Sequence, residues 1–134
     1  MVKTRATPEA NRLIARTRDM IARFGKTLTL RRQTLTVNDY GEVTDNTTTD
    51  YTFSGDLQQG PDIEETLVER GLIQVGEAVL YIVPTDMPAT IVMQDLIVET
   101  NNDIWQVVDL LETGEYTGTE THLAYRCRKY ESDR

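Results

Sequence analysis

The chain has 134 residues, of which 39% are hydrophobic and 27% charged, and its formal net charge is −8. Such a length allows one domain with a modest core, and such a composition excludes a disordered chain. No apolar run approaches the roughly 18 residues that span a bilayer, and residues 1–5 lack the apolar stretch of a signal peptide. A single cysteine, Cys127, excludes an internal disulfide.

The charge is strongly segregated along the chain. Residues 1–32 contain nine Lys or Arg and two acids, which gives +7, whereas residues 33–134 contain five basic and twenty acidic residues, which gives −15. This segregation predicts two surfaces with different partners, although an acidic domain with a basic leader would have the same pattern.

Residues 1–6 have the composition of a flexible leader, and an amphipathic helix is predicted over Pro8–Phe24. Thr7 can cap this helix, Pro8 fits its first turn and Gly25 fits just past its end. Six residues fall on one arc of about 120°: Leu13, Ile14, Thr17, Met20, Ile21 and Phe24. We expect this stripe to contact either the rest of the domain or a partner, and we do not expect it to bind a membrane.

From Lys26 onward the hydrophobic period changes from helical to two residues, which predicts strands. Leu28 and Leu30 have the opposite parity to Leu35 and Val37, which predicts a bulge within residues 31–34. Residues 38–41 form a predicted turn and residues 45–49 a polar tip. A second strand follows with Tyr51, Phe53 and Leu57 on one face, and residues 58–61 end it. Residues 62–70 can make two helical turns that end at Gly71. The remaining predicted strands are residues 77–83, 91–93, 95–100, 104–111 and 121–130, with a hairpin loop at residues 112–118.

Short strands behind one helix predict a mainly β protein, namely a small antiparallel β-barrel with an N-terminal amphipathic helix. The expected division is residues 1–25 for leader and helix and residues 26–134 for the barrel. Residues 79–83 and 107–111 are apolar on both faces, so either the helix or a neighbouring subunit should cover the barrel exterior.

The residues offer little support for catalysis. His122 and Cys127 lie five apart on one predicted strand, so their side chains point to opposite faces and cannot form a nucleophile–base pair. Cys127 is better explained by core packing with Leu123 and Tyr125, and Trp105 by core or interface packing. The acids at 62, 64, 65 and 69 lack the spacing of a calcium loop and are expected on a solvated face. We therefore expect no enzyme activity, metal or cofactor.

The order of features resembles the head-closure, or head–tail connector, proteins of long-tailed phages. The resemblance covers roughly residues 24–130. It is carried by the following pieces in order: Phe24–Gly25 before a Thr/Leu strand, the aromatic strand at residues 51–53, LVERGLI before Gly76, an apolar strand at residues 79–83, DLI at residues 95–97, WQVV at residues 105–108, and the closing YRCR.

This resemblance implies a structural virion protein, assembled in the host cytoplasm, that forms a homo-oligomeric ring at the head–tail junction. The ring would extend the DNA channel below the portal or adaptor protein and contact a tail-completion, tail-terminator or tail tube protein. DNA would pass without sequence-specific binding, and Asp62, Glu64 and Glu65 are candidate channel-lining acids because carboxylates repel phosphates. The alternatives are a tail-completion or tail-terminator protein and a non-viral β-barrel binding module.

Overall fold

The structure is a computed structural model, and it describes residues 8–60, 69, 71–116 and 119–130. One helix, α1 (Pro8–Phe24), precedes six strands and a short 3-10 turn, η2 (Pro84–Asp86). The strands are β1 (Lys26–Val37), β2 (Val43–Gln59), β3 (Glu77–Ile82), β4 (Leu96–Val98), β5 (Ile104–Tyr116) and β6 (Thr119–Lys129). The predicted leader and nearly all of the predicted turns at residues 62–70 lie outside the described residues.

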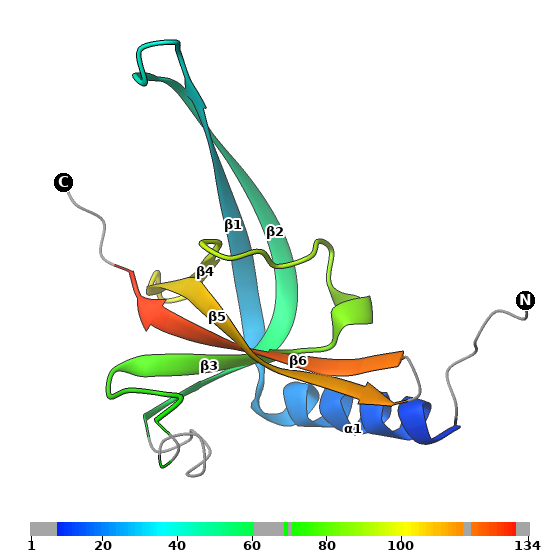
Figure 1. Cartoon of the computed structure of the whole chain (residues 1–134). Coiled ribbons are helices and arrows are strands. Elements are labelled where there is room, and N and C mark those ends of the chain that lie inside the picture. The colour runs from blue at the N-terminus through cyan, green and yellow to red at the C-terminus, as the bar shows by residue number, and fades with distance from the viewer. Residues whose placement is uncertain (1–7, 61–68, 70, 117–118, 131–134) are drawn as a thin grey trace, which may run out of the picture.

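All six strands form one antiparallel sheet that closes into a barrel in the order β1-β2-β3-β6-β5-β4 (Figure 1). The predicted fold, a small antiparallel barrel with an N-terminal helix, is therefore confirmed. Inward-facing residues from every strand fill the barrel, among them Leu30, Leu80, Ile97 and Val107, each almost fully buried. A second, smaller cluster of Ile73, Val79 and Ala124 packs separately from this core.

The C-terminal half of the barrel differs from the prediction in three segments. Residues 91–93 are not a strand, because Val92 accepts a hydrogen bond from the Asp95 amide and Gln94 adopts a φ of 79°. Extended pairing is thus replaced by a turn. Strand β4 is only three residues long, whereas β5 continues to Tyr116 through most of the predicted hairpin loop.

Helix α1 packs on its own barrel, chiefly against β6 and β2. Ile14 is 7% exposed, and Leu13, Met20 and Ile21 are half-buried. Gly25 ends the helix, with its amide donating to the Ile21 carbonyl at 2.7 Å. A Cβ at this position would approach the Gly55 carbonyl oxygen to 2.8 Å, so the joint between α1 and the barrel requires glycine.

Candidate functional site

The most distinctive feature of the surface is a two-stranded arm that extends away from the barrel (Figure 1). We define the arm as residues 32–49, which comprise the end of β1, the turn and the start of β2. Strand β1 pairs with β4 only as far as Arg31, and β2 pairs with β3 only from Asp56 onward. Between these limits each strand pairs, among the described strands, only with the other. At 3.3 Å per residue the paired part is roughly 20 Å long.

The predicted bulge at residues 31–34 is wrong, because β1 pairs with β2 in unbroken register from Lys26 to Thr36. The only shift lies between Thr36 and Val37. The change in hydrophobic parity has another cause: it marks the point where the hairpin leaves the barrel. The inward face ends with Leu30, and the next residues on that face, Arg32 and Thr34, are polar.

On the arm the apolar side chains lie on the outward face, toward the turn. Leu35 and Val37 alternate with threonines on β1, and Val37 lies opposite Val43 on β2. Leu35, Val37 and Val43 are 57%, 57% and 58% exposed, and Tyr40 in the turn is 87% exposed. We call Leu35, Val37 and Val43, together with Tyr40 in the adjoining turn, the apolar arm face. A hairpin that exposes an apolar cluster far from its own core is typical of a surface that another molecule covers.

The turn of the arm has a defined conformation that is held by hydrogen bonds. The Asn38 carboxamide oxygen accepts hydrogen bonds from the backbone amides of Tyr40 at 2.9 Å and Glu42 at 3.0 Å. Gly41 has a φ of 82°, a backbone conformation that favours glycine. The predicted turn at residues 38–41 is therefore confirmed. The predicted polar tip at residues 45–49 is instead part of β2, where threonines pair with β1.

Two ion pairs on opposite faces fix the arm at its base. On the outward face Arg31 donates to both oxygens of Asp50 at 3.0 and 3.2 Å, which lowers the pKa of Asp50. On the other face Arg32 donates to both oxygens of the buried Asp95 at 3.0 and 2.7 Å and to the Thr90 carbonyl at 2.6 Å. Bidentate pairs of this kind restrict orientation, so they hold the direction in which the arm leaves the barrel.

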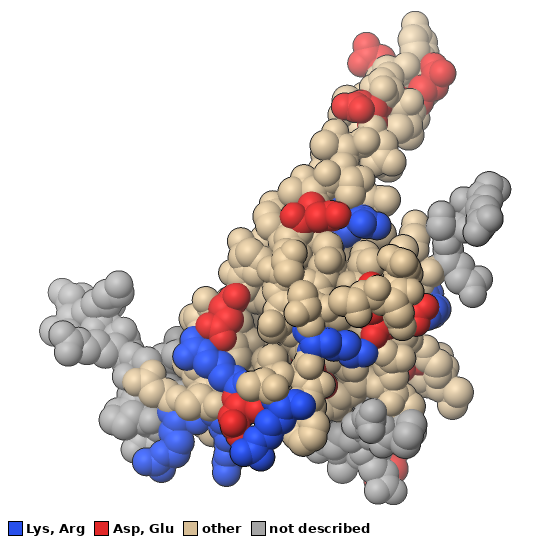
Figure 2. All heavy atoms as spheres, turned by 180° about the vertical axis from the view of Figure 1, so that it is seen from behind, with Lys and Arg blue, Asp and Glu red and all other residues tan. Residues whose placement is uncertain are grey.

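The turn of the arm is acidic, and the opposite end of the molecule is basic (Figure 2). Residues 33–59 contain no Lys or Arg, while Asp39, Glu42 and Asp45 cluster around the turn. On α1 the exposed Arg12 and Arg16 form no ion pair with any described residue. In contrast, Arg18 binds Asp86 at 2.6 Å and Arg23 lies 3.3 Å from Asp19.

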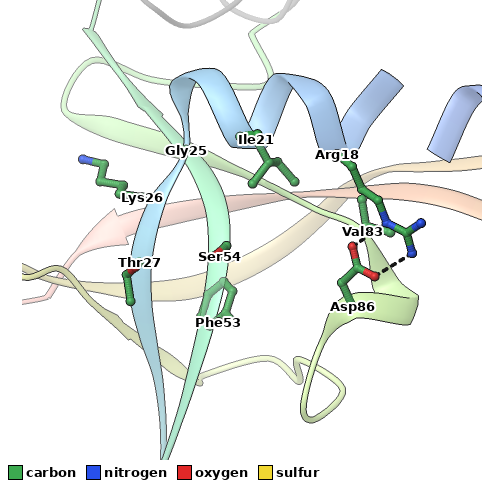
Figure 3. A pocket seen from close by; sticks show the side chains of 10 residues that line it. Arg18, Ile21, Gly25, Lys26, Thr27, Phe53, Ser54, Val83 and Asp86 are labelled. Atoms are coloured by element: carbon green, nitrogen blue, oxygen red, sulfur yellow. Dashed lines mark hydrogen bonds and ion pairs between the residues drawn. The ribbon is translucent and has the colours of Figure 1, made fainter. Parts of the chain in front are cut away.

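Three hollows flank α1. One, of about 580 Å³, lies where Ile21 points from the helix toward Phe53 and where Arg18 reaches Asp86 (Figure 3). A second, of about 450 Å³, lies between the end of α1, at Met20 and Phe24, and the end of β2. The third is a mostly apolar groove of about 450 Å³ between α1 and the β5–β6 hairpin. We call it the helix groove, and its lining residues are Leu13, Arg16, Thr17, Met20, Gly114, Thr121 and His122. A Cβ on Gly114 would collide with the His122 ring, so glycine keeps this wall of the groove compact.

A polar cluster closes one end of the barrel. The buried carboxylate of Glu99 accepts three hydrogen bonds: from the Lys26 ammonium at 2.6 Å, from the Gln59 side-chain amide at 3.3 Å and from the Trp105 indole N–H at 2.9 Å. Lys129 lies 4.9 Å from the centroid of the Trp105 ring, as in a cation–π contact. Among the described residues no buried side-chain polar atom lacks a hydrogen-bond partner, so this cluster is explained by its role in holding the barrel together.

Cys127 and His122, the two residues considered as catalytic candidates, also have roles in packing or hydrogen bonding. Burial raises the pKa of Cys127 to about 12, so its thiol is neutral, and it packs with Leu123 and Tyr125 as predicted. His122 lies on the opposite face of β6 and its Nε2 is 2.7 Å from a Glu112 carboxylate oxygen. Among the described residues no three His, Cys, Asp or Glu are placed to hold a metal ion, and no helix could cross a membrane.

The residues that the sequence suggested for a partner interface differ in how far the barrel covers them. Ile14 covers the barrel, and Leu13 and Met20 line the helix groove. Ile21 lines the hollow of about 580 Å³, and Phe24, which is 70% exposed, lines the hollow beside the end of β2. The stripe on α1 thus packs mainly on its own domain. Asp62, Glu64 and Glu65 lie outside the described residues. The apolar arm face was not predicted from the sequence. The change in hydrophobic parity at Leu35 is its mark in the sequence, but the same change also predicts a bulge.

Comparison with known proteins supports the fold alone. No protein-family model matches the chain, and a search of curated proteins gives no match. Among solved structures, the chain is similar to protein SF1141 from Shigella flexneri 2a, with a TM-score of 0.55 and 15% sequence identity. The match covers 77% of this chain and 89% of that one. This likeness defines the class as a small β-barrel domain and does not extend to an activity.

Proposed function

We propose that the protein is a structural virion protein of the phage head–tail junction, where copies of the chain form a ring around the DNA channel. The proposal rests on the order of sequence features that resembles head-closure proteins. The observation that favours an assembly role is the arm: a rigidly based hairpin whose outward face is apolar and exposed. An exposed apolar surface of this kind is typical of a contact with another molecule.

The distribution of charge is consistent with a ring. A cyclic assembly of identical subunits uses two different patches on each subunit, one complementary to the other. Here an acidic, apolar arm and a basic helix lie at opposite ends of one barrel (Figures 1 and 2). A net charge of −8 also suits a wall along which DNA must slide, because few cations are available to bind phosphate.

The direct test is genetic and structural. In a phage that encodes this chain, deleting its gene should give DNA-filled heads and free tails that do not join, as seen by negative-stain electron microscopy. Supplying the chain from a plasmid should restore joined particles, and cryo-electron microscopy should find it in the neck. Tails of irregular length would instead support a tail-terminator role. Normal infectious particles after deletion would refute the proposal.

A further inference from the structure

We infer that the arm of one copy docks in the helix groove of the next copy, so that the apolar arm face covers Leu13 and Met20 while the acidic turn meets Arg12 and Arg16. This inference deepens the proposed function, on which it rests, by naming the contact between neighbouring subunits.

The first argument is chemical complementarity. The arm presents Leu35, Val37, Val43 and Tyr40 together with the turn acids Asp39 and Glu42, with no basic residue between positions 33 and 59. The helix groove presents apolar lining beside Arg16, and Arg12 lies one turn earlier on α1. Both surfaces combine exposed apolar area with charges that lack an ion pair among the described residues, and the signs are opposite.

The second argument is geometry. The arm and α1 lie at opposite ends of the barrel, so the arm of a copy does not contact its own helix groove (Figure 1). A contact between two different patches on identical chains is heterologous, and repeated heterologous contacts generate rings or filaments. The arm's base, held by Arg31–Asp50 and Arg32–Asp95, orients every copy in the same way.

A second copy is favoured over an unrelated protein because both halves of the contact exist on this chain. A nucleic acid partner for the arm is disfavoured, since three carboxylates surround its turn. The arm is also a poor candidate for membrane binding, because anionic lipid would repel the same carboxylates.

Site-directed cross-linking tests the contact in a Cys127→Ser background, which removes the native thiol. One variant carries Val43→Cys on the arm and another carries Leu13→Cys in the helix groove. Mixing the two under mild oxidation should give disulfide-linked dimers faster than either variant alone. A chain with both substitutions should give a ladder of linked copies. Thermal melts check that each variant folds, since Val43 is exposed and Leu13 is half-buried.

Charge reversal tests specificity. Arg16→Glu should weaken self-association roughly tenfold or more, and adding Asp39→Arg in the exposed turn of the same chain should restore it, because both partners are then reversed. Arg128→Glu is the matched control: this exposed arginine on β6 lies outside the helix groove and should have no such effect.

The outcomes separate this inference from the proposed function. If the cross-link is absent both in the concentrated protein and in assembled particles, or if Arg16→Glu assembles normally, the docking inference is wrong, whereas a neck ring seen in particles would still support the proposed function. If the chain cross-links as expected yet deletion leaves normal phage, the contact stands and the proposed function fails.

Discussion

Val37 and Val43 lie directly opposite each other near the end of the arm, and each is more than half exposed. Cross-strand pairs of β-branched residues stabilise a sheet by about 0.2–1 kcal/mol, mostly by contact with each other and with covering residues. No described residue covers this pair, so most of its apolar surface remains available to another molecule. The arm is therefore the part of the surface where substitutions should separate folding from assembly.

Replacing both valines with threonine should leave the fold intact and weaken assembly. Threonine has nearly the same shape and a similar preference for strands, so the free energy of unfolding should change by less than about 1 kcal/mol. Urea denaturation measures stability, and electron microscopy of particles, with sedimentation of the free protein, measures assembly.

The control for this pair lies on the opposite face of the same arm. Thr34 is paired with Thr47 there, and changing both to serine alters the polar face by two methyl groups. That variant should assemble normally. Equal loss of assembly in the two variants would show that the arm acts through its general shape and not through its apolar face.

A buried carboxylate should contribute strongly to stability. Glu99 joins β1, β2 and β5 through Lys26, Gln59 and Trp105, and it is 5% exposed. Glu99→Ala would leave the indole N–H without its acceptor, and Lys26 is partly exposed and can turn to water. We expect a loss of about 2–4 kcal/mol in urea denaturation. Glu112→Ala, which removes an exposed partner of His122, should cost less than about 1 kcal/mol.

Features of the fold that depend on spacing within one segment could be predicted from the sequence. Features that depend on contacts between distant segments could not. Helix α1, the turn at Asn38 and the face shared by Leu123, Tyr125 and Cys127 depend on spacing within one segment, and each was predicted correctly. Barrel closure depends on the three residues of β4, a strand too short to be delimited by its own sequence. The Glu99–Lys26 contact joins residues 73 positions apart, which spacing along the chain cannot reveal.

The candidate site was missed for a related reason. A switch in hydrophobic parity within a strand has two physical causes: an extra residue that rotates the chain, or a strand that leaves its core and turns apolar on the outer face. Leu35 and Val37 give the same alternation in both cases. Only the register with β2 distinguishes them, and this register is a property of two strands together.

The thiol of Cys127 should be nearly inert in the folded protein. Burial raises its pKa from 9.0 to about 12, so at pH 8 almost none of it is thiolate. Iodoacetamide should label the native chain far more slowly than the urea-unfolded chain. Because the unfolded thiol ionises first, the protein should also lose stability as pH rises from about 9 toward 12. Cys127→Ser should lack this contribution, and fast native labelling would contradict the buried placement.

The Arg32–Asp95 pair should control the rigidity of the arm. Asp95 is 4% exposed and accepts hydrogen bonds from Nε and Nη2 of Arg32 and, at 2.9 Å, from the Val92 amide. Asp95→Asn keeps an oxygen for Val92 but removes the charge that holds Arg32. We expect a local cost of about 1–3 kcal/mol, which appears as faster hydrogen exchange of amides in residues 32–49 while the core strands β3 and β6 exchange as before.

Asp50→Asn is the matched comparison, because it removes the other anchor at the arm's base. Asp50 is about half exposed, so its pair with Arg31 competes with water and should contribute less than the Arg32–Asp95 pair. Arm exchange should therefore rise more in Asp95→Asn than in Asp50→Asn. If neither variant changes exchange in the arm, pairing between β1 and β2 alone determines its rigidity. If β3 and β6 exchange faster as well, Asp95 supports the whole barrel and not the arm in particular.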